Sequence, residues 1–232
     1  MSSKIKKVKN HTPPANKNTI TIFEPFKPRT KNQANVIRTL IENDITIVHG
    51  VAGTGKSYIA LGLALEHLSQ GKINKIIIAR PTVEASPKGL GFIPGGIDEK
   101  MAPYLLPLFE TIKKFIGKEK LAYLLHLNII EVAPLEYLRG RNFEDCYVIA
   151  DECQNATFEQ LKMLMTRLCN NAKIFILGDT DQTDLGYTRF QSGLSTCIKK
   201  LEGKVDGLGV CYLDKTDIQR NKIVGQILTA LE

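Results

Sequence analysis

The sequence lacks any apolar stretch of the ~20 residues that a membrane-spanning helix needs, so we expect no integral membrane protein. Its first residues, MSSKIKKVKN, lack the apolar centre of a signal peptide, and no internal repeat is present. Aromatic residues are scattered rather than gathered into an RNA-recognition motif, and the acidic residues form no evident nuclease cluster. The apolar fraction of 43% still allows a proper core, and 232 residues suit one domain with extensions.

Cysteine is present, but not in the patterns of a cross-linked protein. The five cysteines are an odd number without a C-x-x-C pair, which argues against a disulfide framework or a zinc ribbon. Four stand in apolar or helical contexts and are predicted to be small core residues: Cys146, Cys153, Cys169 and Cys197. We therefore expect a reducing, cytoplasmic setting.

The net charge of +7 belongs to the N-terminal region. Residues 1–31 hold eight Lys/Arg and one Asp/Glu, whereas the rest of the chain holds 23 of each sign. Residues 1–19 are also poor in apolar side chains, so we expect a disordered basic arm there and one domain over residues 20–232. The arm is either a solvated tail or a contact to nucleic-acid phosphate.

Apolar runs alternate with helical patterns from residue 20 onward. The runs are ITIVH, KIIIAR, NIIEVA, CYVIAD, KIFILGD and LGVCYL. The helical patterns cover residues 56–69, 99–126 (one or two helices), 157–169, 192–202 and 217–231. Together they predict an α/β fold in which a mainly parallel sheet is covered by helices on both faces.

The stretch GVAGTGKS follows the first apolar run and fits the phosphate-loop spacing G-x-x-x-x-G-K-[ST]. Its glycines let successive N–H groups point inward, and the helix that follows adds a positive N-terminus. Lys56 would reach the β- and γ-phosphates, and the Ser57 hydroxyl would bind Mg²⁺. An ordinary glycine-rich turn is the alternative. The predicted nucleotide-binding residues are Gly50, Val51, Ala52, Gly53, Thr54, Gly55, Lys56 and Ser57.

A second apolar strand ends in the acidic pair Asp151 and Glu152, in CYVIADECQN. A nucleotide-bound Mg²⁺ needs a carboxylate at the tip of a strand beside the loop strand, and Asp151 fits. Glu152 would face the γ-phosphate and orient and deprotonate water. About 95 residues separate the pair from the loop, which leaves room for an intervening strand.

A third apolar strand leads into FILGDTDQTDLG, where Gln182 is a candidate sensor of the γ-phosphate. An Asx-rich turn is the alternative interpretation.

Blocks from about residue 21 to 230 resemble, in order, the PhoH family of ATPases: GVAGTGKS, ARPTVEA, LGFIPGGIDEKMAPYLLPL, YLRGRNFEDCYVIADECQNATFEQLKMLMTRL and GDTDQTDL, followed by SGL. The resemblance implies a single RecA-like P-loop domain, similar to the first motor domain of superfamily 1 helicases. It also implies ATP hydrolysis with Mg²⁺ and a role in RNA metabolism. Some members carry a PIN or KH domain, for which we expect no room here. Small stand-alone members occur in bacteriophages, and a phage-encoded chain would act in the host cytoplasm.

The resemblance assigns roles to matching residues of this sequence. It implies that Lys56 and Ser57 hold phosphate and Mg²⁺, that Asp151 holds Mg²⁺, and that Glu152 activates water. It makes Gln182 a helicase-type sensor. A further residue, Gln33, precedes the loop strand where related helicases read adenine, although a plain helix-surface residue fits equally well.

Two segments offer contacts to nucleic acid. The long stretch ARPTVEASPKGLGFIPGG follows a strand, and long loops in compact domains are usually functional. In helicase-like domains this segment touches the backbone, so Arg80, Thr82 and Lys88 are candidates; a loop that packs subunits together is the alternative. YLRGRNF offers Arg139 and Arg141, of which Arg141 would alternatively pair with Glu144 or Asp145.

One catalytic part is missing. Related helicases hydrolyse ATP between two motor domains, and the second domain supplies an arginine. This chain has only one motor-like domain. We therefore expect a neighbouring copy to supply the arginine in a cyclic homo-oligomer, predicted as a hexamer, with single-stranded RNA or DNA in the channel. Arg220 is the first candidate, with Arg167 and Arg189 as alternatives, although each could be an ordinary surface arginine.

Three functions remain open at this point. The first is an ATPase that acts on single-stranded nucleic acid, RNA rather than DNA, with helicase-like or remodelling activity. The second is a P-loop kinase for a small molecule, which the helicase-like pairing of motifs disfavours. The third is a nucleotide-gated nucleic-acid-binding protein whose turnover is incidental.

Overall fold

The computed structural model describes residues 20–23, 25–81, 97–180 and 192–219. The six apolar runs all form strands, namely β1 (Ile45–Gly50), β2 (Lys75–Arg80), β3 (Ile130–Pro134), β4 (Cys146–Ala150), β5 (Lys173–Gly178) and β6 (Leu208–Leu213). They build one sheet in the order β3-β2-β4-β5-β1-β6, and every neighbouring pair is parallel. The predicted parallel α/β fold is confirmed.

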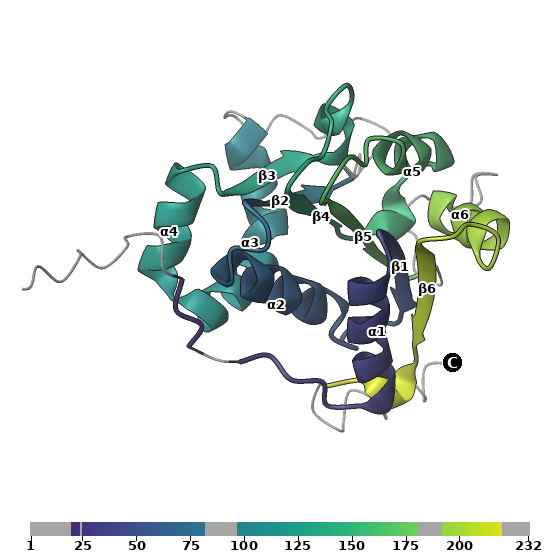
Figure 1. The fold of residues 1–232 in the computed structure, drawn as a ribbon, viewed down its shortest axis with the longest axis horizontal. Helices are drawn as coiled ribbons and strands as arrows, with labels where there is room; N and C mark the ends of the chain where they lie inside the picture. The colour runs from purple at the N-terminus through teal and green to yellow at the C-terminus, as the bar shows by residue number, and fades with distance from the viewer. Residues whose placement is uncertain (1–19, 24, 82–96, 181–191, 220–232) are drawn as a thin grey trace, which may run out of the picture.

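Helices cover both faces of this sheet (Figure 1). The α-helices are α1 (Lys31–Glu42), α2 (Lys56–Ser69), α3 (Ile97–Ile116), α4 (Lys118–His126), α5 (Phe158–Met165) and α6 (Gly193–Leu201). Short 3₁₀ turns are η1 (Leu135–Leu138), η2 (Cys153–Asn155) and η3 (Lys215–Asp217). The pattern at 99–126 is therefore two helices. The helix expected over 217–231 falls mostly outside the described residues.

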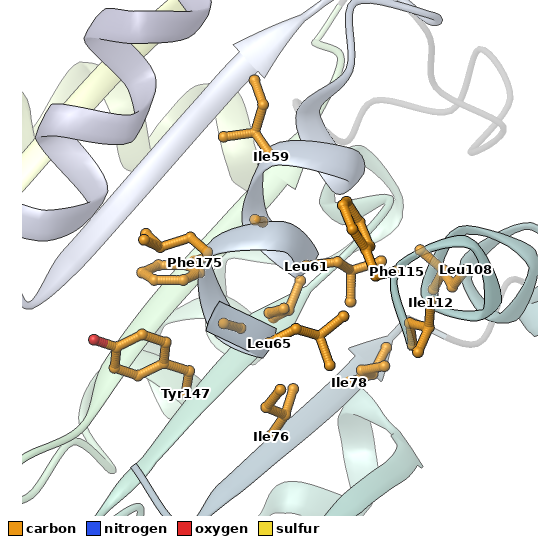
Figure 2. Packing of buried hydrophobic residues seen from close by; sticks show 14 of the residues in the cluster. Ile59, Leu61, Leu65, Ile76, Ile78, Leu108, Ile112, Phe115, Tyr147 and Phe175 are labelled. Atoms are coloured by element: carbon orange, nitrogen blue, oxygen red, sulfur yellow. The ribbon is translucent and has the colours of Figure 1, made fainter. Parts of the chain in front are cut away.

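Alternate strand residues feed two separate cores, because successive side chains point to opposite faces of a sheet. On β2, Ile76 and Ile78 pack with α1 to α4, whereas Ile77 packs with α5 and α6. Figure 2 shows the first core, where side chains of α2 and α3 interdigitate over β2, β4 and β5. Both faces are buried, so the strands are continuously apolar rather than alternating.

The cysteines follow the prediction with one exception. Cys146, Cys153 and Cys197 are buried, free thiols, as is Cys211. Cys169 is exposed, because α5 ends at Met165 and Cys169 lies in the turn that leads to β5. Its assignment to the core is therefore wrong. In the part of the chain that the structure describes, no helix has the length and apolarity that crossing a bilayer requires.

Candidate active site

The predicted catalytic motifs meet at one edge of the sheet. The phosphate loop follows β1, Asp151 follows β4 and Asp179 follows β5. Since all three strands are parallel, their carboxyl ends lie at the same edge, where α/β sheets bind ligands. The residues between the loop and the acidic pair hold β2 and β3, whereas β5, which follows both motifs in the sequence, lies between β1 and β4 in the sheet. The strand of Asp151 is therefore one strand away from the loop strand and not directly beside it.

The phosphate loop has the backbone that its glycines allow. Gly53 and Gly55 have φ angles of 84° and 89°, in the left-handed region where other residues are strained. At Gly50 the limit is space, because a Cβ would lie 2.6 Å from the carbonyl oxygen of Leu213 on β6. α2 begins at Lys56, so its free N–H groups face the loop.

Lys56 folds back over its own loop. Its Nζ donates to the carbonyl oxygen of Gly50 and to that of Val51, at 3.1 Å for the latter. Burial lowers the pKa of the Lys56 ammonium, while nearby carboxylates oppose the shift, Asp179 most strongly. A buried cation satisfied by neutral carbonyls is ready to exchange them for an anion.

Ser57 and Asp151 are direct partners although they are far apart in the sequence. The Ser57 hydroxyl donates to Oδ1 of Asp151 at 2.9 Å. Burial and then the neighbouring Glu152 carboxylate raise the pKa of Asp151. In nucleotide sites Mg²⁺ takes one or two carboxylates together with phosphate oxygens and water, so these two oxygen donors fit that ion. Among the described residues no group of three or more His, Cys, Asp or Glu side chains is arranged to hold a metal.

Glu152 is held from two sides. Nη2 of Arg80 lies 3.0 Å from Oε1, and the amide of Gln154 donates to Oε2 at 2.6 Å. Glu152 also has a φ of 56°, a left-handed backbone that costs a non-glycine residue about 1 kcal/mol. Its side chain remains 40% exposed, so water can reach the carboxylate. Strain of this kind is typical of functional sites.

Gln154 links two strand ends, and its role is not evident from the sequence. It is buried, and while its amide nitrogen holds Glu152, its Oε1 accepts from the backbone N–H of Asp179 at 3.2 Å. Gly178 makes room for it, since a Cβ there would lie 2.9 Å from that oxygen. Asp179 was also missed, although it ends an apolar strand just as Asp151 does.

Gln33 lies under the phosphate loop, 3% exposed, so its interpretation as a helix-surface residue is wrong. Its Nε2 donates to the carbonyl oxygen of Thr54 at 2.9 Å, and its Oε1 accepts from the backbone N–H of Arg29 at 2.7 Å. Both ends of the amide are therefore engaged within the protein.

The two arginines of YLRGRNF have different surroundings. Arg141 forms a two-armed ion pair with Glu131 of β3, with N–O distances of 2.5 and 2.9 Å, and not with Glu144 or Asp145. Arg139 is exposed, and Arg167 is half-buried. The remaining predicted residues and the arm lie outside the described residues: Thr82, Lys88, Gln182, Arg189, Arg220 and residues 1–19.

A family model described as PhoH-like protein matches residues 25–232. The chain belongs to the PhoH family. It is 42% identical over 207 residues to the PhoH-like protein of Bacillus subtilis (strain 168), covering 89% of this chain and 64% of that one. It is 35% identical over 208 residues to Protein PhoH of Escherichia coli (strain K12), covering 89% and 58%. The chain thus spans slightly less than two thirds of these relatives.

Solved structures overlap with this PhoH-family chain more loosely. The Hef helicase domain of Pyrococcus furiosus gives a TM-score of 0.46 at 14% identity, over 81% of this chain and 38% of that one. The Pif1 helicase of Candida albicans gives 0.41 at 16% identity, over 82% and 40%. The family assignment rests on the sequence match.

Proposed function

We propose that this protein hydrolyses ATP with Mg²⁺ and uses the reaction to act on single-stranded nucleic acid, RNA in preference to DNA. The observation that supports hydrolysis is the meeting of Lys56, the Ser57–Asp151 pair and Glu152 at one sheet edge. Phosphoryl transfer needs positioning and charge stabilisation above all, and these groups provide both.

The residues divide the work by their chemistry. The N–H groups of the loop and Lys56 would bind the phosphate oxygens. Ser57 and Asp151 would hold Mg²⁺, which would supply positive charge to neutralise the phosphates. Glu152 accepts the proton of the attacking water, and its carboxylate is exposed enough to reach that water. The products are ADP and inorganic phosphate. We propose that Gln182, whose segment follows β5, senses the γ-phosphate.

Action on nucleic acid is the less direct part of the proposal. It is supported by family membership and by the basic residues 1–19. Arg80 leads into the stretch with Thr82 and Lys88, but its guanidinium already pairs with Glu152. We retain Arg139 as a backbone contact, because it is exposed, whereas the charge of Arg141 is already matched by Glu131. The free, mostly buried thiols suit the reducing cytoplasm in which we place the protein.

The test is the steady-state ATPase rate of Glu152→Gln, with and without single-stranded RNA and DNA. Glutamine keeps the shape of the side chain but cannot accept the proton. We expect nucleotide affinity to persist and kcat to fall by roughly 10²-fold or more. The control is Glu159→Gln, an exposed glutamate on α5 that lies outside the site and should leave the rate unchanged.

Single-stranded RNA should raise the wild-type rate more than DNA does. Glu152→Gln turning over ATP at the wild-type rate would remove Glu152 as the base. A wild-type rate that neither nucleic acid changes would remove the nucleic-acid part of the proposal while leaving the ATPase intact.

A further inference from the structure

Two segments, one near each end of the chain, donate hydrogen bonds to the backbone of the phosphate loop. Gln33 of α1 donates to the carbonyl oxygen of Thr54 at 2.9 Å. The backbone N–H of Gln219 donates to the carbonyl oxygen of Gly53 at 3.0 Å. Two consecutive carbonyls of the loop are thus held by groups that lie outside it.

Holding these carbonyls also aims two N–H groups. In a planar trans peptide the C=O and N–H point in opposite directions. The peptide that carries the Gly53 carbonyl also carries the N–H of Thr54, and the next one carries the N–H of Gly55. Since both carbonyls are pulled outward, both N–H groups turn inward, where a phosphate loop presents its donors.

A buried carboxylate joins the two gripping segments. Asp217 is fully buried and accepts from the Thr30 hydroxyl at 2.5 Å, from the Asn32 amide at 3.0 Å and from the backbone N–H of Asp214 at 2.9 Å. Thr30 is also the N-cap of α1 and accepts from the backbone N–H of Gln33. We call Thr30, Gln33, Asp217 and Gln219 the loop clamp.

The amide of Gln33 is engaged at both ends and buried. Its nitrogen holds Thr54, its oxygen holds the N–H of Arg29, and its side chain is 3% exposed. Gly55 lies against it, where a Cβ would be 3.2 Å from Nε2. Because the side chain is buried in this position, turning its amide toward an adenine would release the Thr54 carbonyl.

We propose that Gln33 is a positioning residue that presets the phosphate loop for a triphosphate, and that it does not read the base. The inference rests on the triphosphate site of the proposed function, though not on hydrolysis. Its consequence is a nucleotide site in which Gln33 contributes equally to the binding of any triphosphate, whatever base is attached.

The experiment is a calorimetric titration of the full chain and of Gln33→Ala with Mg-ATP, Mg-GTP and Mg-tripolyphosphate. We expect Gln33→Ala to lower the affinity for all three ligands by the same factor, roughly tenfold. The reason is the loss of a hydrogen bond that orients the N–H groups of an anion-binding loop. Gln33→Glu keeps the acceptor for Arg29 but lacks the donor to Thr54, so it should lower the affinity for all three ligands at least as much. Gln70→Ala, an exposed glutamine at the far end of α2, should change none.

Tripolyphosphate carries no base, so it distinguishes a residue that reads the base from one that positions the loop. If Gln33→Ala weakened ATP alone and left tripolyphosphate unchanged, Gln33 would be a base reader and the inference would be overturned. Wild-type protein that bound none of the three ligands would overturn the proposed function as well. If Gln33→Ala folded poorly, Gln33→Met, which keeps the volume without the hydrogen bonds, would give the same comparison.

Discussion

Glu131 is the charged residue of β3, and it forms ion pairs with two basic side chains. It contacts Lys75 of β2 at 2.7 Å and Arg141 at 2.5 Å, and its own side chain is 18% exposed. The hydrogen bond from Arg141 and then that from Lys75 outweigh burial and lower the pKa of Glu131 to about 2. The three side chains hold the edge strand β3, β2 and the residues that precede β4 together.

Glu131→Gln should lower the free energy of unfolding at pH 7 by about 1 kcal/mol, because the pair is partly screened by solvent. The folded pKa lies below the ordinary value, so the carboxylate stabilises the protein above roughly pH 4.5 and loses that effect as the pH falls toward 2. Urea unfolding at several pH values should therefore show wild type and variant converging between these limits.

Glu110→Gln is the matched control for this measurement. Glu110 is exposed and pairs only along its own helix with Lys113, so its removal should leave the unfolding curve at pH 7 unchanged. A gap between wild type and Glu131→Gln that stayed constant down to pH 2 would show that the loss is one of packing and not of charge.

The proposed catalytic residues could be named from the sequence because their motifs depend on neighbouring positions. Lys56, Ser57, Asp151 and Glu152 stand in motifs whose spacing is local. The hydrogen-bond and ion-pair partners of Gln33, Gln154 and Arg141 could not be predicted, since each contact joins segments that only the folded sheet brings together. Cys169 was misplaced for a related reason, because nothing local indicates that α5 stops at Met165.

At the scale of elements, α6 positions the catalytic edge indirectly. Its first residue, Gly193, lies so close to the start of α5 that a Cβ would be 2.3 Å from the Thr157 carbonyl carbon. The preceding Ser192 donates to the backbone carbonyl of Gln154 at 3.2 Å. Gln154 in turn holds Glu152. A shift of α6 therefore reaches the proposed base through two hydrogen bonds.

Gly193→Ala should push α6 off the backbone of α5, lowering the free energy of unfolding by about 2 kcal/mol and the melting temperature by roughly 5 °C. Because Gln154 moves with it, kcat should also fall, which thermal melts and steady-state assays would measure in parallel. Lys199→Ala, on the exposed end of the same helix, should change neither. An unchanged free energy of unfolding in Gly193→Ala would show that α5 and α6 can move apart without loss of stability.

Strands were predictable because parallel sheets bury both faces and leave unbroken apolar runs. The order of those strands was not predictable, since β5 follows both β1 and β4 in the sequence and yet lies between them in the sheet. Nothing in LGVCYL itself indicates that β6 pairs with β1, the first strand of the chain. That neighbour is set by α1, which packs against β6.

At the scale of the whole molecule, we propose a ring in which each nucleotide site is completed by an arginine of the next copy. The first candidate for that arginine is Arg220, which lies outside the described residues. A head-to-tail contact between copies gives a ring when its rotation closes and an open filament when it does not.

Mixing the inactive variants Lys56→Ala and Arg220→Ala in equal amounts should restore about a quarter of the wild-type ATPase rate. That is the share of interfaces in which an intact loop meets an intact finger if copies exchange at random. Arg38→Ala, an exposed arginine of α1, should be active alone and serves as the control. A monomer with full activity at every dilution would refute the ring.

The position of β1 between β5 and β6 has a consequence for how the protein is made. β1 carries the phosphate loop, yet its two neighbours, β5 and β6, begin roughly 120 and 160 residues later in the chain. At usual rates of translation, ~5–20 residues per second, the ribosome needs on the order of ten seconds to deliver the first of them. Until then the loop strand has no partner on either side. The ability to hold a nucleotide is therefore acquired only after β5 and β6 have been made, and a chain that stalls before β5 displays an apolar strand without its sheet neighbours.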